Sequence, residues 1–133
     1  MSGILEMTVP GNPEYIKIAK MAAGAAASLE GFDIEKVDDI KMAVGEACKA
    51  ITCHGFEGWS ENYQLAMDMA GKVLTIEVED KLCKHQVSKG TRPCMDCPGE
   101  GDLGIQIIKS LMDDVEIVKA GDGCRSIRMV KNK

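Results

Sequence analysis

The stretch from residue 38 to residue 56 carries apolar side chains at three- and four-residue steps, which places them on one face of a helix. These residues are Ile40, Val44, Ala47, Cys48 and Ile51. A helix with such a face has to pack against a core. Glu46, Ala50 and His54 follow one another at steps of four on a different line of the same helix. Glu46 is therefore either a solvated surface charge or a placed chemical group, and periodicity alone favours the surface charge.

Alternating apolar and polar residues predict five strands, and helical periodicity predicts three helices. The strands fall at residues 5–9, 63–69, 74–78, 115–118 and 127–129, and the helices at about 13–30, 34–54 and 105–112. The segment 81–100 has no period and is typical of a long functional or disordered loop. This order predicts a two-layer α/β sandwich, in which three helices cover one face of a mixed, mostly antiparallel sheet.

Local signals predict where the first two helices begin and end. Asn12 and Pro13 are expected as the N-cap and first-turn residue of the first helix, and Gly31 is expected to close it. Asp33 is a good N-cap for the helix that carries Glu46. The second helix is expected to break near Gly55.

Composition limits the classes of protein that the chain can represent. Its 133 residues predict a single domain over 1–133, and its net charge of -5 without a dense basic patch disfavours nucleic-acid binding. The longest uncharged alanine-rich stretch is shorter than the roughly 20 residues that span a bilayer. Without a basic-then-apolar start, a cytoplasmic protein with reduced thiols is expected.

The predicted loop contains four residues that could bind a metal ion. Cys83, His85, Cys94 and Cys97 form C-x-H followed by C-x-x-C, a set of nitrogen and sulfur ligands suited to tetrahedral Zn²⁺. Free thiols or a redox-sensitive pair explain the same residues. The other three cysteines are expected to be structural residues of helices and strands.

Three stretches resemble the bacterial anti-sigma factors of the partner-switching type, which are serine-protein kinases with a histidine-kinase-like (GHKL) ATP-binding fold. The stretches are VPGNPEYIKIAKMAAGAAASLEGFDIEKVDDIKMAVGEACKAITCHGF, GDLGIQIIKSLMDDVEI and RSIRMVK. The resemblance implies ATP with Mg²⁺ as cofactor, a homodimer, and a sigma factor or an anti-anti-sigma protein as partner.

The resemblance implies a role for each of three residues on the second helix. Glu46 matches the general base that takes a proton from a serine of the anti-anti-sigma protein. Ala50 stands where the family has an Asn that holds Mg²⁺, and its methyl group offers no oxygen ligand. His54 matches a His that is common in the motif, or is simply a residue that caps the helix end.

Further nucleotide contacts are implied elsewhere in the chain. Asp80 matches an adenine-binding Asp, although Leu82 and Lys84 replace the glycines that follow it in the family. The family's phosphate-binding G-L-G turn aligns with Asp102-Leu103-Gly104, preceded here by Gly101. Ser126 lies near a Thr that borders the adenine pocket.

Three functions follow as hypotheses. The first is an anti-sigma-type regulator that retains kinase activity, with nucleotide binding weakened by the altered motifs. The second is a protein-binding module that has lost nucleotide chemistry on the same fold. The third is a metal- or thiol-based sensor, in which Cys83 to Cys97 would change the partner-binding surface.

Overall fold

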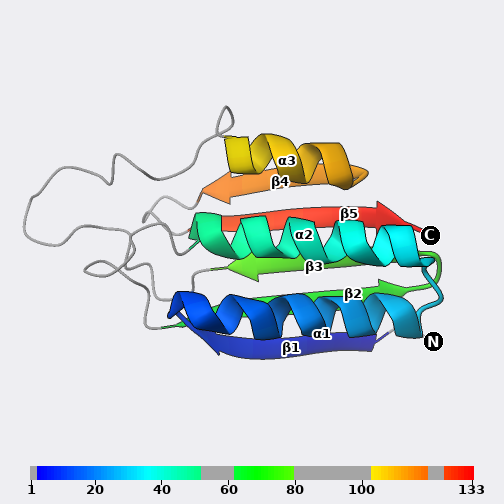
Figure 1. Ribbon diagram of the computed structural model, residues 1–133, viewed down its shortest axis with the longest axis horizontal. Helices are drawn as coiled ribbons and strands as arrows, with labels where there is room; N and C mark the ends of the chain where they lie inside the picture. The colour runs from blue at the N-terminus through cyan, green and yellow to red at the C-terminus, as the bar shows by residue number, and fades with distance from the viewer. Residues whose placement is uncertain (1–2, 52–61, 80–102, 120–124) are drawn as a thin grey trace, which may run out of the picture.

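The structure is a computed structural model that describes residues 3–51, 62–79, 103–119 and 125–133 (Figure 1). Its elements, in chain order, are β1 (Gly3–Pro10), the 3₁₀-helix η1 (Pro13–Tyr15), α1 (Ile16–Leu29), α2 (Ile34–Ile51), β2 (Asn62–Ala70), β3 (Val73–Glu79), α3 (Leu103–Leu111), β4 (Asp114–Lys119) and β5 (Arg125–Asn132). The predicted loop over 81–100 and the predicted helix end near Gly55 lie outside the described residues.

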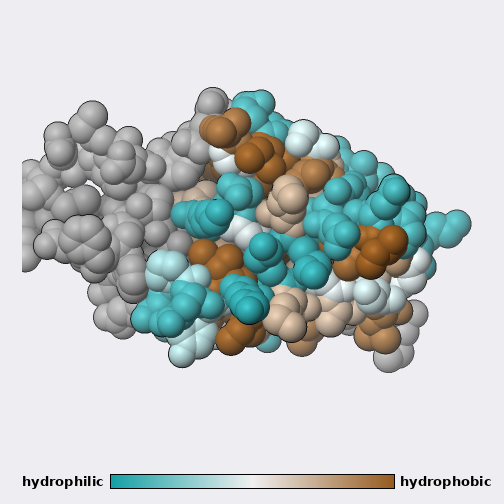
Figure 2. Space-filling model, in the orientation of Figure 1, coloured by the Kyte–Doolittle hydropathy of each residue, from teal (hydrophilic) through white to brown (hydrophobic). Residues whose placement is uncertain are grey.

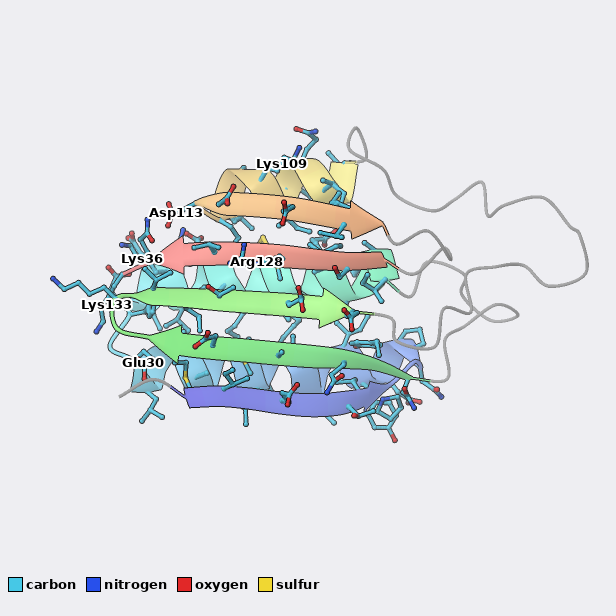
Figure 3. All side chains as sticks on the ribbon, turned by 180° about the vertical axis from the view of Figure 1, so that it is seen from behind. Glu30, Lys36, Lys109, Asp113, Arg128 and Lys133 are labelled. Atoms are coloured by element: carbon cyan, nitrogen blue, oxygen red, sulfur yellow. The ribbon has the colours of Figure 1, made fainter. Side chains whose placement is uncertain are left out.

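The sheet has the strand order β1-β2-β3-β5-β4, and all four described strand pairs are antiparallel. The three helices lie side by side on one face, with α2 between α1 and α3 (Figure 1). The opposite face carries no helix among the described elements (Figure 3). The predicted two-layer α/β sandwich is therefore confirmed. In the part of the chain that the structure describes, no helix is long and apolar enough to cross a membrane.

The first helix begins at the predicted residues, with a short 3₁₀ turn that the sequence did not predict. Asn12 occupies the N-cap position, but its side chain makes no capping hydrogen bond to the described helix, which begins with the short η1 turn. Pro13 is the first residue of that turn, as predicted. At the other end, Gly31 has φ +90°, Phe32 N–H donates to the Ala27 carbonyl and Gly31 N–H donates to the Ser28 carbonyl. This is a Schellman motif, so Gly31 closes α1 as expected.

Helix α2 begins at the predicted cap. The backbone N–H of Lys36 donates to Asp33 Oδ1 at 2.9 Å, which satisfies one of the N–H groups that a helix start leaves unpaired. The face of α2 from Val37 to Ile51 is buried against the sheet, where inward residues of the strands meet it. The largest fully buried side chains are Tyr63, Ile40, Ile51, Leu65, Met67, Leu74, Ile76, Ile105, Ile108, Ile127, Met129 and Val44.

A buried cation joins the C-terminal end of α3 to the rest of the fold. Lys131 is almost fully buried, and its ammonium donates to the carbonyl of Leu111, the last residue of α3. The same ammonium lies 3.6 Å from the Asp39 carboxylate on α2. A cation at the C-terminal end of a helix interacts favourably with the helix dipole. Lys131 therefore connects α2, α3 and β5.

Among the described residues, Cys48 on α2 and Tyr63 on β2 form a pair of titratable side chains in the core. Both are buried, and the thiol lies beside the phenol hydroxyl, for which it is only a weak hydrogen-bonding partner. Burial raises the pKa of the Cys48 thiol to about 11, and burial beside Cys48 also raises the pKa of Tyr63. A buried thiol with a raised pKa is unreactive, which agrees with a structural role for Cys48.

The cap of α2 can be tested by substitution. Replacing Asp33 with Ala should lower the free energy of unfolding by about 1 kcal/mol, because the Lys36 N–H loses its acceptor. Asp33→Asn is the matched control, since an Asn oxygen can accept the same hydrogen bond. Urea denaturation measures both variants. Equal losses in the two variants would contradict a capping role.

The Cys48 thiol should make stability depend on alkaline pH. Its native pKa lies above the unfolded value of 9.0, so its contribution is complete below pH 9 and is lost as the pH rises toward 11. Between pH 8 and pH 10, the wild-type protein should lose about 1 kcal/mol more than Cys48→Ala. Urea denaturation at the two pH values gives this difference. Parallel losses in the two proteins would show that Cys48 is not protonated in a dry core.

Candidate functional site

Glu46 lies on a partly exposed ridge of α2 that it shares with Lys49, in the half of the helix that leads to Ile51. Its side chain is 22% exposed, and its Oε2 lies 3.3 Å from the ammonium of Lys49, whose side chain is 66% exposed. A half-exposed pair at this i,i+3 spacing contributes only a few tenths of a kcal/mol. The pair therefore affects the orientation of the carboxylate more than the stability of the helix. Periodicity alone favoured Glu46 as a solvated surface charge, but its side chain is less exposed than that of a typical surface charge.

Ala50 follows Glu46 by one turn and is 5% exposed. Successive residues at a step of four lie about 40° apart around a helix, so Ala50 is near Glu46 but turned further toward the core. Its methyl group cannot ligate a cation. In the described ranges, no group of three or more His, Cys, Asp or Glu side chains could hold a metal ion.

The first turn of α3 lies at the same end of the molecule as the C-terminal half of α2 (Figure 1). Leu103 begins the helix and is exposed, whereas Ile105 and Ile108 are buried and hold α3 against the core. Gly104 lies between them and is half-buried. The start of a helix carries partial positive charge from its backbone N–H groups, a suitable environment for phosphate. Gly101 lies outside the described residues.

The end of β3 and the start of β5 also lie at this end of the molecule, where Glu79 pairs with Ser126 across the two strands (Figure 1). Asp80 would follow directly, but it lies outside the described residues. Four predicted nucleotide-binding segments thus converge at one end of the fold. The topology brings these segments together. The role of each residue in nucleotide binding stays a prediction.

Ser126 and Glu46 lie on different sides of the sheet. Side chains alternate between the two faces of a strand, and Ile127 and Met129 of β5 are buried beneath the helices. Ser126 therefore lies on the other face, together with Arg128, which Figure 3 shows on the side without helices. Glu46 lies on the helix side. Ser126 is nevertheless 7% exposed, and its place near the adenine pocket stays a prediction.

The predicted metal ligands and one helix residue cannot be placed. Cys83, His85, Cys94 and Cys97 all lie outside the described residues, as does His54. The zinc hypothesis therefore stays a prediction. Sequence reasoning also missed one residue that the structure brings to the site, namely Lys49. Its i,i+3 spacing from Glu46 is a signal that could have identified the ion pair.

Comparison with known proteins identifies the family. Residues 9–131 match the family described as histidine kinase-like ATPase domain. The serine-protein kinase RsbW of Bacillus pumilus is 32% identical over 125 residues, which cover 86% of this chain and 77% of the relative. RsbW of Bacillus licheniformis is 28% identical over 123 residues, which cover 85% of this chain and 76% of the relative.

A solved structure supports the fold. The crystal structure of the RsbU and RsbW domains of a Mycobacterium tuberculosis protein superposes with a TM-score of 0.71 at 17% identity. The match covers 98% of this chain and 32% of that longer chain, so the present chain spans about a third of it. The convergence of α2, α3, β3 and β5 at one end is thus part of a known architecture. The chain belongs to the histidine kinase-like ATPase domain family, and within it to the relatives of the RsbW serine-protein kinases.

Proposed function

We propose that this protein is an anti-sigma-factor-like regulator, whose main act is to bind a sigma factor or an anti-anti-sigma protein in the cytoplasm. The observation that carries the proposal is the position of Glu46, half-buried on α2 at the end where the first turn of α3 and the β3 and β5 ends meet. The RsbW relatives are named serine-protein kinases, which agrees with a carboxylate at this place. We take residues 1–133 as one domain, with the segment 81–100 as a lid.

Glu46 would act as the general base in a serine kinase. A carboxylate within reach of a serine hydroxyl can accept its proton as the hydroxyl attacks a phosphoryl group. ATP, when bound, supplies that phosphoryl group. The first turn of α3, at Leu103 and Gly104, would interact with its phosphates, and Asp80 and Gly101 are proposed as further contacts. Lys49 would hold the Glu46 carboxylate in one orientation through the 3.3 Å ion pair.

Ala50 favours a weakened kinase activity over a fully retained one. Because its buried methyl group replaces an oxygen ligand, Mg²⁺ lacks a protein contact beside Glu46. The second candidate function, a non-catalytic binding module, is supported by the same observation. We further propose that Cys83, His85, Cys94 and Cys97 form a zinc- or thiol-sensing lid.

We also infer that two copies of the chain associate through α1 and β1. β1 is an edge strand, so the hydrogen-bonding groups on its outer side are available to a second strand. Beside it, α1 exposes an apolar stripe that includes Ile18, Ala25 and Leu29. A small groove between α1 and the sheet edge is lined almost entirely by apolar residues, including Leu5 and Leu29. A self-complementary patch of this kind suits a two-fold dimer.

The role of Ala50 predicts a gain of function. Replacing Ala50 with Asn should strengthen Mg²⁺-dependent ATP binding roughly tenfold, because the side-chain oxygen restores a ligand. Calorimetric titration with ATP, with and without Mg²⁺, measures the effect. Ala50→Leu is the control, since it adds similar volume without an oxygen. If the wild-type protein already binds Mg-ATP as tightly as Ala50→Asn does, the proposed weakening is wrong.

The dimer predicts the effect of a charge on α1. Leu29 is 80% exposed on the stripe, and Leu29→Glu should shift the protein from dimer to monomer in sedimentation velocity experiments. Ile34→Glu is the matched control, because Ile34 is 71% exposed and lies on α2 rather than on the α1 stripe. A dimer that survives Leu29→Glu, or that is lost equally in Ile34→Glu, would refute this interface.

A further inference from the structure

A groove of about 870 Å³ runs along the outer surface of the α1–α2 pair. Four lysines line it, Lys17 and Lys20 from α1 and Lys41 and Lys49 from α2. Figure 2 shows hydrophilic side chains gathered over these two helices, with hydrophobic residues between them. Lys49 is also the partner of Glu46, so the groove extends to the ridge that carries the proposed base.

Two of these lysines are positioned by glycines on the opposite helix. A Cβ atom added to Gly24 of α1 would lie 2.8 Å from Lys41 Cδ, and one added to Gly45 of α2 would lie 3.0 Å from Lys20 Cδ. Each lysine stem therefore lies against the neighbouring helix, where a larger residue than glycine would force the stem to move. Long aliphatic stems packed in this way keep the ammonium groups at the surface. The reciprocal packing holds two cations at fixed places along the groove.

The groove is a positive region on an acidic protein. Among its lining residues, Glu14 is the one acidic side chain against four lysines, whereas the whole chain has a net charge of -5. Clustered charges of one sign along a groove attract ligands of the opposite sign and orient them. The floor also contains aliphatic surface from Pro13, Ile16 and Met21. A ligand of this groove should therefore combine negative charge with apolar groups.

We propose that the groove binds an acidic, amphipathic segment of a partner protein, and that Lys17, Lys20 and Lys41 select for it. Lys41 and Lys49 are eight residues apart on α2, about 12 Å along the helix. This spacing matches several carboxylates on an extended or helical segment, and the aliphatic floor contacts the apolar side chains between them. A small inorganic anion would use only part of the groove.

The inference deepens the proposed function and rests on it, because it gives the chemical character of the partner that Glu46 would meet. A segment bound along the four lysines ends at Lys49, and thus beside the Glu46 carboxylate. A serine at that end of the segment would be delivered to the proposed base. The groove would then set specificity at a distance from the residue that accepts the proton.

Peptide binding to the full chain tests this assignment. The probe is a fluorescein-labelled twelve-residue peptide of alternating Glu and Leu, and the matched neutral probe has Gln in place of Glu. Fluorescence anisotropy should show binding of the Glu peptide that weakens with salt, and no comparable binding of the Gln peptide. The double variant Lys17→Glu/Lys41→Glu should weaken binding of the Glu peptide by on the order of tenfold or more.

The control variant carries the same change in charge elsewhere. Lys72→Glu/Lys133→Glu alters exposed residues outside the groove and should bind the Glu peptide nearly as well as the wild type. Equal weakening in both double variants would overturn the proposal, since only the net charge would matter. Displacement of the peptide by micromolar inorganic triphosphate would also overturn it, because the groove would then be a small-anion site. Nucleotide is absent from this assay, so its failure leaves the roles of Glu46 and Ala50 untouched.

Discussion

The burial of α2 is the constraint on which the rest of the structure depends. Its inner face packs on the sheet, and each fully buried Ile or Val on that face contributes about 1.5–3 kcal/mol relative to an exposed position. With α2 fixed over the middle of the sheet, α1 and α3 occupy the two remaining places on the same layer (Figure 1). The opposite face of the sheet stays without a helix among the described elements. One amphipathic helix therefore decides both the layer order and the side on which a site can form.

The same helix also separates two surfaces with different chemistry. On the α1 side, Gly45 accommodates the stem of Lys20, and Lys41 lies over Gly24, so the seam between the helices presents fixed cations. Around the ridge, Glu46 is held 3.3 Å from Lys49, and Ala50 turns a methyl group toward the core. A protein that binds partners along one side of α2 and nucleotide near its end needs both surfaces on a rigid element. Burial of α2 provides that rigidity, and in the proposed function the absence of an oxygen ligand at Ala50 shifts the balance from phosphoryl transfer toward binding.

Sequence reasoning predicted those features that depend on local chemistry. Alternation in the strands, the Asp33 cap and the helix end at Gly31 each follow from the residue and its immediate neighbours, and the structure confirms them. Asn12 occupies the predicted N-cap position, although its side chain makes no capping hydrogen bond and the helix starts with the 3₁₀ turn over Pro13–Tyr15. The Lys131 contacts join residues that are far apart in the chain, so no local pattern could reveal them.

The site was harder to predict than the fold for the same reason. Ser126 was assigned from a resemblance, yet strand alternation places it on the face away from Glu46. The lysine groove depends on the close approach of α1 and α2 at Gly24 and Gly45, which sequence spacing does not show. By contrast, Glu46 and Ala50 lie on adjacent turns of one helix, so their four-residue spacing in the sequence predicts that they are close together.

The most direct test of the central claim, nucleotide binding without the usual Mg²⁺ clamp, is hydrogen–deuterium exchange of the wild-type protein with ATP. We expect ATP to slow exchange in the first turn of α3, around Leu103 and Gly104, to the same extent with Mg²⁺ and with EDTA. Protection that appears only with Mg²⁺ would contradict the claim, because it would show that another group replaces the ligand missing at Ala50.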